Sequence, residues 1–287
     1  MNTKTMSNQL PPSIRSFEEL RPMFDYDRAL PLKVEESGVE HKGGVSIHDV
    51  SYASPSNGRV RAYLVMPPGK GPFAGVIFVH PAPGNRSTFL EEAVRLAKKG
   101  AVSLLIDAPW AQGEAWARTL GQPESDRKQH HQTAINIRRA VDVITSRTEV
   151  DAARLGYVGH SFGALFGGVL AGVEKRIRAC VLMAGVGSFT DVAALNIPSL
   201  TGQALEEYSQ VMGPIDPIYY IGHAAPSALF FQFGSQDDFF SKEKFLAYYQ
   251  AGSEPKFVKW YNADHFLDDE EARDDRMEWL GKQLHLE

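Results

Sequence analysis

The sequence predicts an α/β protein in which a mostly parallel sheet of about eight strands carries helices on both faces. Short, continuously apolar runs alternate with amphipathic stretches from residue 74 onward, and such runs are typical of strands buried on both faces. Parallel strands joined by helices need right-handed crossovers, which place helices on both sides of the sheet. Two segments of alternating apolar and polar residues come first and predict a leading antiparallel hairpin.

The first part of the chain is predicted to form an N-terminal arm followed by this hairpin. The arm spans residues 1–44, and Ser16 is placed to cap a short helix within it. The hairpin strands are predicted at 45–53 and 60–66, because a Ser-Asn-Gly turn signal lies between them. Residues 45–287 are expected to form a single α/β domain.

The rest of this domain is assigned from its apolar periodicity and stop signals. The predicted strands are 74–79, 101–106, 154–159, 177–183, 228–233 and 256–261. The predicted helices are 87–99, 125–146, 162–172, 241–251 and 268–286. Ligands of such sheets bind beyond the carboxyl ends of the strands, so the residues that directly follow each strand are the candidate functional residues.

The composition argues against several classes of function. The 287 residues include 30 basic and 35 acidic residues, and the net charge of -5 favours neither nucleic acid nor an anionic membrane as a partner. The single cysteine, Cys180, lies in an apolar run, so we expect a buried thiol and no multi-cysteine metal site. No run approaches the ~18 apolar residues of a membrane span, and no signal peptide is recognised. We therefore expect a soluble cytoplasmic protein, with its oligomeric state left open.

A Gly-x-Ser-x-Gly motif occupies residues 159–163, between a predicted strand and a predicted helix. In this context a nucleophilic serine sits on a turn so sharp that its backbone is strained. A side chain at Gly159 or Gly163 would collide with neighbouring backbone, which explains the two glycines. Ser161 is therefore the candidate nucleophile, and a structural turn serine is the alternative.

Acidic and histidine side chains follow two other predicted strands. Asp237 and Asp238 come after the strand 228–233, and Asp264-His265 comes after the last strand. Serine, acid and histidine therefore occur in that order, each beyond the end of its own strand. Acyl transfer needs this set, because the histidine takes the serine proton while the acid orients the imidazole and stabilises its charged form. His265 is the candidate base, and a surface loop histidine is the alternative.

These motifs resemble the α/β-hydrolase superfamily, and more narrowly its dienelactone hydrolase-like and related serine esterase branch. Gly159-His160-Ser161-Phe162-Gly163 matches the nucleophile turn, Gly234-Ser235-Gln236-Asp237 the turn that carries the acid, and Asp264-His265-Phe266 the histidine loop. The resemblance covers residues 45–285 and implies the α/β-hydrolase fold, with Asp237 as the acid in preference to Asp238 and Asp264. Dienelactone hydrolases proper use a cysteine nucleophile, so a lactone substrate is not implied.

The resemblance also implies an oxyanion hole. His80-Pro81-Ala82 lies where the family has its oxyanion loop, but the family usually has glycine at the position of Pro81. Proline has no N–H to donate. The expected oxyanion donors are therefore the backbone N–H groups of Ala82 and Phe162.

The segment 188–225 fits the place where this superfamily inserts a cap, and a short cap suggests a fairly open site. Ordinary packing of helical chain on the core is the alternative, and whether the N-terminal arm covers this region is left open. His80 and His160 are expected to hold the oxyanion loop and the nucleophile turn, whereas His130 and His131 are expected to face solvent. The candidate substrate-pocket residues are His80, Trp110, His160, Tyr208 and Met212.

The sequence thus predicts a serine hydrolase that cleaves carboxylic esters of small or medium size through an acyl-enzyme. It predicts no cofactor and no metal, and a small-molecule ester is the expected partner. A thioesterase, an acetyl-sugar esterase or a peptidase could use the same three residues. A non-catalytic, ligand-binding member of the fold is disfavoured, because every member of the triad has a candidate.

Overall fold

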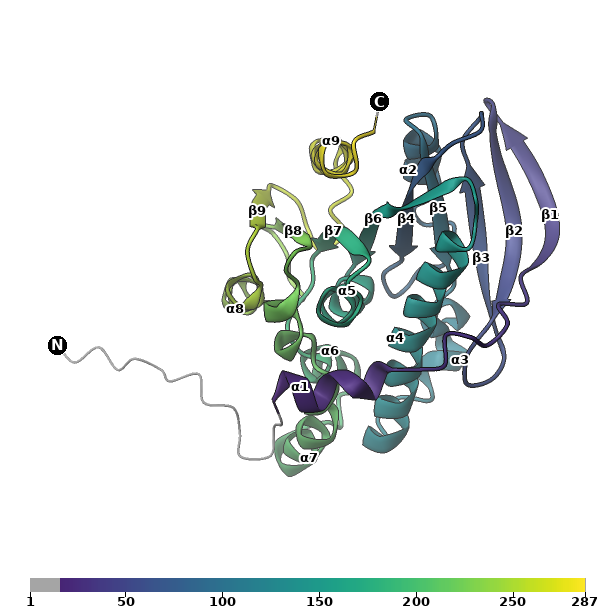
Figure 1. The fold of residues 1–287 in the computed structure, drawn as a ribbon. Helices are drawn as coiled ribbons and strands as arrows, with labels where there is room; N and C mark the ends of the chain where they lie inside the picture. The colour runs from purple at the N-terminus through teal and green to yellow at the C-terminus, as the bar shows by residue number, and fades with distance from the viewer. Residues whose placement is uncertain (1–15, 287) are drawn as a thin grey trace.

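One twisted sheet runs through the whole molecule, as the computed structural model shows (Figure 1). The structure describes residues 16–286, so residues 1–15 of the predicted arm and Glu287 lie outside it. Within the described residues the sheet has nine strands in the order β1-β2-β3-β5-β4-β6-β7-β8-β9. The predicted fold class, a mostly parallel sheet with leading antiparallel strands, is confirmed.

The central and C-terminal strands are parallel, and β4 lies between β5 and β6. All residues of β5 and β8 are buried, as expected for strands covered on both faces. The bounds of the six strands are Phe73–Val79 (β4), Ala101–Ile106 (β5), Val150–His160 (β6), Ile177–Met183 (β7), Ala228–Gly234 (β8) and Lys256–Tyr261 (β9). They agree with the predicted strands except at a few terminal residues.

The predicted hairpin is formed by β2 (Val45–Ala53) and β3 (Arg59–Met66), which pair antiparallel. A further strand, β1 (Glu35–Lys42), lies within the segment predicted as an arm and pairs antiparallel with β2. Every residue of β1 is exposed. Because it buries no face, its sequence lacks the apolar alternation that indicates a strand. Charged residues on such an edge discourage pairing with another chain.

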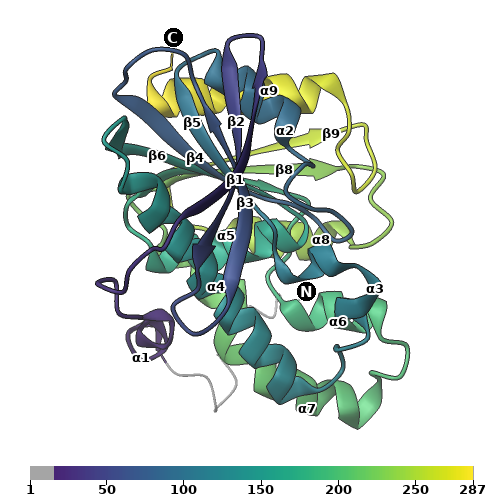
Figure 2. The same ribbon diagram turned by 90° about the vertical axis from the view of Figure 1, so that its right-hand side faces the viewer.

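Helices cover both faces of the sheet (Figures 1 and 2). One face carries α2 (Leu90–Ala97) and α9 (Glu270–Leu284). The other carries α4 (Pro123–Thr145), α5 (Phe162–Val173) and α8 (Lys242–Ala251). The buried apolar side chains form two clusters, one on each side of the sheet. Within residues 16–286, no helix combines the length and apolar character needed to cross a membrane.

Two further helices lie in the predicted cap segment, between β7 and β8. They are α6 (Phe189–Asn196) and α7 (Gly202–Met212), and α7 packs against α4. Figure 2 shows this pair beside the lower end of α4 and below α5, away from the sheet. The remaining short pieces are α1 (Phe17–Leu20), α3 (Glu114–Ala117) and the 3-10 turns η1 (Arg21–Phe24), η2 (Pro109–Gln112), η3 (Gly213–Ile215), η4 (Pro217–Tyr219) and η5 (Ile221–His223).

The described part of the N-terminal arm packs on the side of α4 opposite to α3 and α6 (Figure 2). Phe24 meets Tyr220 edge to face at a centroid distance of 5.2 Å, and Phe17 stacks on His223 at 3.8 Å. Both aromatic contacts bury apolar surface against the turns that precede β8.

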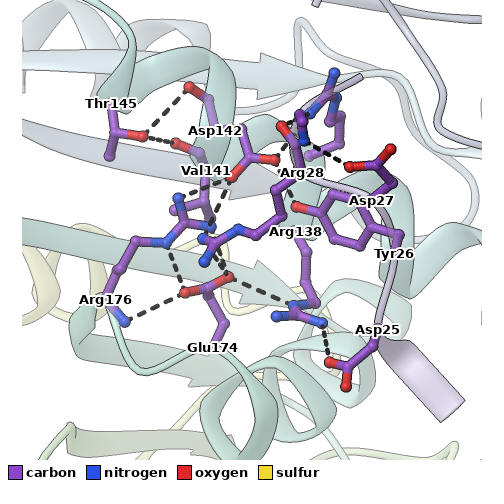
Figure 3. Close-up of polar contacts among 12 residues, drawn as sticks. Asp25, Tyr26, Asp27, Arg28, Arg138, Val141, Asp142, Thr145, Glu174 and Arg176 are labelled. Carbon is purple, nitrogen blue, oxygen red and sulfur yellow. Dashed lines mark hydrogen bonds and ion pairs between the residues drawn. The ribbon is translucent and has the colours of Figure 1, made fainter. Parts of the chain in front are cut away.

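An ion-pair network fixes the arm to α4 and to the turn before β7 (Figure 3). Tyr26 donates its hydroxyl proton to Asp142 over 2.6 Å, and Arg176 lies 2.8 Å from the same carboxylate. Glu174 is 3% exposed and contacts Arg176 at 2.7 Å and Arg138 at 3.4 Å. Burial alone would raise the pKa of Glu174, but the adjacent guanidinium groups outweigh it, so the pKa is lowered.

We expect Glu174→Gln to destabilise the protein by about 3 kcal/mol at pH 7, because the buried Arg138 and the partly buried Arg176 lose a buried counter-charge. A lowered folded pKa gives stability that is present above the unfolded value and lost as pH falls through the folded value. The difference between wild type and variant should therefore shrink below about pH 4.5, the ordinary value for Glu174. Urea unfolding at several pH values measures both effects.

The matched control is Glu278→Gln, which removes a carboxylate that is 67% exposed and paired with Lys282. Its effect on the free energy of unfolding should stay within about 0.5 kcal/mol. An equal loss of unfolding free energy in both variants would show that the buried ion pairs of Glu174 stabilise the protein no more than an exposed pair does.

Candidate active site

The turn between β6 and α5 holds Ser161 in a strained conformation, with φ 52° and ψ -115°. Its N–H donates to the Met183 carbonyl at 2.8 Å, which ties the turn to β7. A Cβ at Gly163 would collide with the carbonyl of Val79 on β4, and one at Gly159 would collide with the carbonyl of Gly163. The two glycines are therefore required by backbone crowding, as the sequence predicts.

Three of the predicted residues meet at the carboxyl ends of β6, β8 and β9. Nε2 of His265 lies 3.0 Å from Oγ of Ser161, and its Nδ1 lies 2.6 Å from Oδ2 of Asp237. The other carboxylate oxygen of Asp237 accepts the N–H groups of Phe239 and Phe240, at 2.9 and 3.0 Å. This arrangement can move a proton from the serine oxygen to the imidazole while the carboxylate fixes the tautomer.

The competing acids lie elsewhere. Asp238 is exposed, and exposed Asp264 accepts the N–H of Phe266 at 2.9 Å. Asp107, which follows β5, accepts the N–H of Arg86 at 2.8 Å and so holds a loop. Among these four acids of the described residues, Asp237 alone forms a hydrogen bond with the His265 ring.

The predicted oxyanion donors border the same cavity as Ser161. Within the described residues, neither the Ala82 N–H nor the Phe162 N–H has a hydrogen-bond partner. Phe162 is the first residue of α5, where an N–H has no intrahelical acceptor and the helix dipole favours negative charge. Both groups can therefore donate to an oxyanion that forms next to Ser161.

Two buried histidines hold the loops around these groups. His80 accepts the Ala108 N–H at Nε2 and donates from Nδ1 to the Pro81 carbonyl, at 3.1 and 2.8 Å. His160 donates from Nε2 to the carbonyl of His265 at 2.8 Å, which fixes the backbone of the histidine loop. Burial lowers the pKa of His160 to about 3, so its ring is neutral at physiological pH.

A cavity of about 250 Å³ opens onto Ser161 and His265. Its walls come from the oxyanion loop, α3, α4, α6, α7 and the segments after β8 and β9. Most of the lining side chains are apolar: Pro81, Ala82, Pro83, Trp116, Ala117, Leu120, Phe162, Phe189, Val192, Ala193, Leu195, Ile197, Phe239, Phe240 and Phe266. Among residues 16–286, the His, Cys, Asp and Glu side chains form no cluster that could ligate a metal ion.

A model of the dienelactone hydrolase family matches residues 60–277. The chain belongs to this family. The predicted resemblance is thereby confirmed, and this dienelactone hydrolase family member is an esterase-type hydrolase. A search of curated protein sequences found no match.

Solved structures with similar folds include two acetyl xylan esterases. Acetyl xylan esterase 1 from Thermoanaerobacterium sp. JW/SL YS485 has a TM-score of 0.80 and 16% identity, covering 94% of each chain. The acetyl xylan esterase from Paenibacillus sp. R4 has a TM-score of 0.75 and 19% identity, covering 93% of each chain. An S-formylglutathione hydrolase from Agrobacterium tumefaciens has a TM-score of 0.65 and 17% identity, covering 87% of this chain and 99% of that one. At these identities the likeness shows a shared fold.

Of the five predicted pocket residues, only Tyr208 lines the cavity of this family member. The structure corrects the other four, because their side chains are committed elsewhere. Trp110 donates from Nε1 to the His80 carbonyl at 3.2 Å and stacks on Phe166, and Met212 is fully buried in the core. His80 holds the oxyanion loop, and His160 lies behind the histidine loop, facing the side of α2 and α9.

The sequence reasoning missed several walls of the cavity. His130 was expected to face solvent, but it is 5% exposed and lines the cavity, because α7 covers this part of α4. Phe239 and Phe240 directly follow the acid turn, so their position beyond a strand end could have indicated them. No local signal marks Trp116, which lies in the four-residue helix α3.

We expect Asp237→Asn to lower kcat for ester hydrolysis by about 10⁴-fold, because the amide no longer holds the imidazole in the required tautomer. Asp238→Asn is the matched control, since its side chain is the exposed neighbour. That variant should keep wild-type kcat within about twofold. Steady-state hydrolysis of an ester by the two folded variants decides between the two acids, and the reverse result would assign the role to Asp238.

Proposed function

We propose that this family member is a serine carboxylesterase that hydrolyses small or medium esters through an acyl-enzyme. The supporting observation is the continuous line of hydrogen bonds from Ser161 through His265 to Asp237, which ends in a largely apolar cavity. A buried carboxylate that orients a histidine beside a serine hydroxyl is the arrangement that activates a weak nucleophile. A small-molecule ester is the only partner this proposal requires.

In the acylation step, Oγ of Ser161 attacks the ester carbonyl carbon while Nε2 of His265 takes the hydroxyl proton. The carbonyl oxygen becomes negative and accepts the N–H groups of Ala82 and Phe162. When the tetrahedral intermediate collapses, the bond to the alcohol oxygen breaks and His265 gives its proton to the leaving alcohol. Asp237 stays ionised throughout and stabilises the transient imidazolium.

In the deacylation step, a water molecule loses a proton to His265 and attacks the acyl carbon. The same two N–H groups hold the second oxyanion. The bond to Oγ then breaks, His265 returns the proton to Ser161, and the carboxylic acid leaves. Proton transfers at His265 therefore balance over the full cycle, so no cofactor is consumed.

The cavity supports an apolar substrate of limited size. Its volume of about 250 Å³ lies near the lower end of ordinary small-molecule sites. Exposed apolar side chains extend the surface around its mouth, since Leu195, Phe239 and Phe266 are 45–50% exposed. Such a rim favours esters with short aliphatic or aromatic groups.

An acetyl-sugar esterase is the second candidate, because two of the most similar folds are acetyl xylan esterases that align over 93–94% of this chain. Thioesters and amides could be cleaved by the same three residues. A panel of acyl esters, thioesters, acetylated sugars and aminoacyl amides separates these substrate classes by their kcat/KM.

We expect Ser161→Ala to lower kcat for p-nitrophenyl acetate and butyrate by about 10⁶-fold. Labelling by a fluorophosphonate probe should be lost as well, because only an activated serine reacts with it. Ser235→Ala, an exposed serine in the acid turn, should label and turn over like wild type. Retained turnover in a folded Ser161→Ala protein would overturn the assignment of the nucleophile.

A further inference from the structure

His130 is a buried polar residue that the proposed mechanism does not use. It lies on α4, and its ring meets Phe189 edge to face at a centroid distance of 4.7 Å. Phe162 and Phe166 lie against it at 5.9 and 5.7 Å. The side chain is 5% exposed and lines the cavity that opens onto Ser161. A polar ring among aromatic neighbours needs a hydrogen-bond partner for each nitrogen.

The hydrogen bond at Nδ1 fixes the tautomer of this ring. Nδ1 lies 2.7 Å from the carbonyl oxygen of Asp126, one turn earlier on α4. A carbonyl oxygen only accepts, so the proton is on Nδ1 and Nε2 carries a lone pair. Burial lowers the pKa of His130 to about 4, so the ring is neutral at physiological pH. Within the described residues, Nε2 has no hydrogen-bond partner.

Tyr208 presents a second acceptor from α7. Its hydroxyl donates to Oδ2 of Asp126 at 2.9 Å, so what it still offers is an oxygen lone pair. Asp126 is fully buried and does not line the cavity, and the N–H of Gly121 holds the same Oδ2 at 2.8 Å. Both cavity-lining groups are therefore oriented by one residue behind the wall, His130 by the backbone carbonyl of Asp126 and Tyr208 by its carboxylate, and both have given their proton to it.

We infer that Nε2 of His130 accepts a hydrogen bond from a hydroxyl group on the substrate. The inference rests on the proposed ester hydrolysis and names its substrate class: esters that carry a neutral hydroxyl on an otherwise apolar chain. An acceptor that faces a largely apolar cavity without a partner from the described residues gains a hydrogen bond when a hydroxyl donor enters. An ammonium group fits less well, because no carboxylate lines the described cavity to offset its desolvation.

The test compares matched esters that differ only at the end of the chain. Each set has a terminal methyl, hydroxyl or methoxy group on chains of four to eight carbons, placed on the acyl side or on the alcohol side. The measured quantity is the ratio of kcat/KM for the hydroxyl ester to that for its methyl partner. At the preferred chain length we expect His130→Phe to lower this ratio by about tenfold or more, because it keeps the aromatic packing and removes the acceptor.

Two controls separate hydrogen bonding from packing. His130→Gln can place an amide oxygen near the position of Nε2, so it should recover part of the hydroxyl preference. His131→Phe changes the adjacent histidine, which contacts the Met23 carbonyl on the side of the arm, and should leave the ratio unchanged. The methoxy ester accepts but does not donate, so it should behave like the methyl ester in wild type.

A binding experiment gives an independent readout on protein that keeps His130. In folded Ser161→Ala protein with ¹⁵N-labelled histidine, the hydroxyl ester should shift the His130 Nε2 resonance, and its methyl partner should not. An unchanged kcat/KM ratio in His130→Phe, or no selective shift with the hydroxyl ester, overturns the inference while leaving ester hydrolysis intact. Failure of wild type to cleave any ester overturns the proposed function, and the NMR titration still decides whether the acceptor site binds a hydroxyl.

Discussion

The strained backbone at Ser161 is the constraint on which the site depends. A non-glycine residue in such a conformation costs roughly 1–3 kcal/mol, so it persists only where the surroundings determine it. Here the surroundings are β4 and β7: Gly163 packs against the Val79 carbonyl, and Met183 accepts the Ser161 N–H. The same turn directs Oγ toward His265 and, within residues 16–286, leaves the Phe162 N–H without an acceptor. Contacts with the central strands thus stabilise the strained backbone conformation of Ser161.

The position of the base depends on this turn as well as on the last strand. His160 immediately precedes Ser161 and donates to the His265 carbonyl, so the histidine loop is fixed directly to the end of β6. Asp237 is held by two backbone N–H groups of its own turn, which fixes the orientation of its carboxylate toward the imidazole. The three side chains therefore lie on turns that hydrogen bonds tie to one another and to the strand ends, and these bonds set their relative distances.

The sequence predicts the fold and the strand-end residues well, because a polar residue after a buried apolar run is a local signal. It predicts the cavity poorly, because whether a side chain lines a cavity or fills the core depends on tertiary packing. Met212 and Trp110 are as apolar as true wall residues such as Phe189, but they are enclosed by other elements. His130 lies in a polar stretch that reads as solvent-facing, and only the packing of α7 on α4 buries it. β1 is not predicted because all of its residues are exposed, so its sequence shows no apolar alternation.

The two ends of the helix α4 contact different parts of the molecule. Its C-terminal half, around Asp142, binds the N-terminal arm through charges, whereas its N-terminal turns, from Asp126 to His130, meet α7 and the cavity. The triad residues follow β6, β8 and β9, so none of them belongs to α4. We therefore expect substitutions in the N-terminal turns of α4 to change which group the cavity accepts without moving the serine, the acid or the base. In the proposed function, substrate choice and bond cleavage are placed on different elements, and they meet at Phe162, whose N–H is the proposed oxyanion donor and whose ring lies against His130.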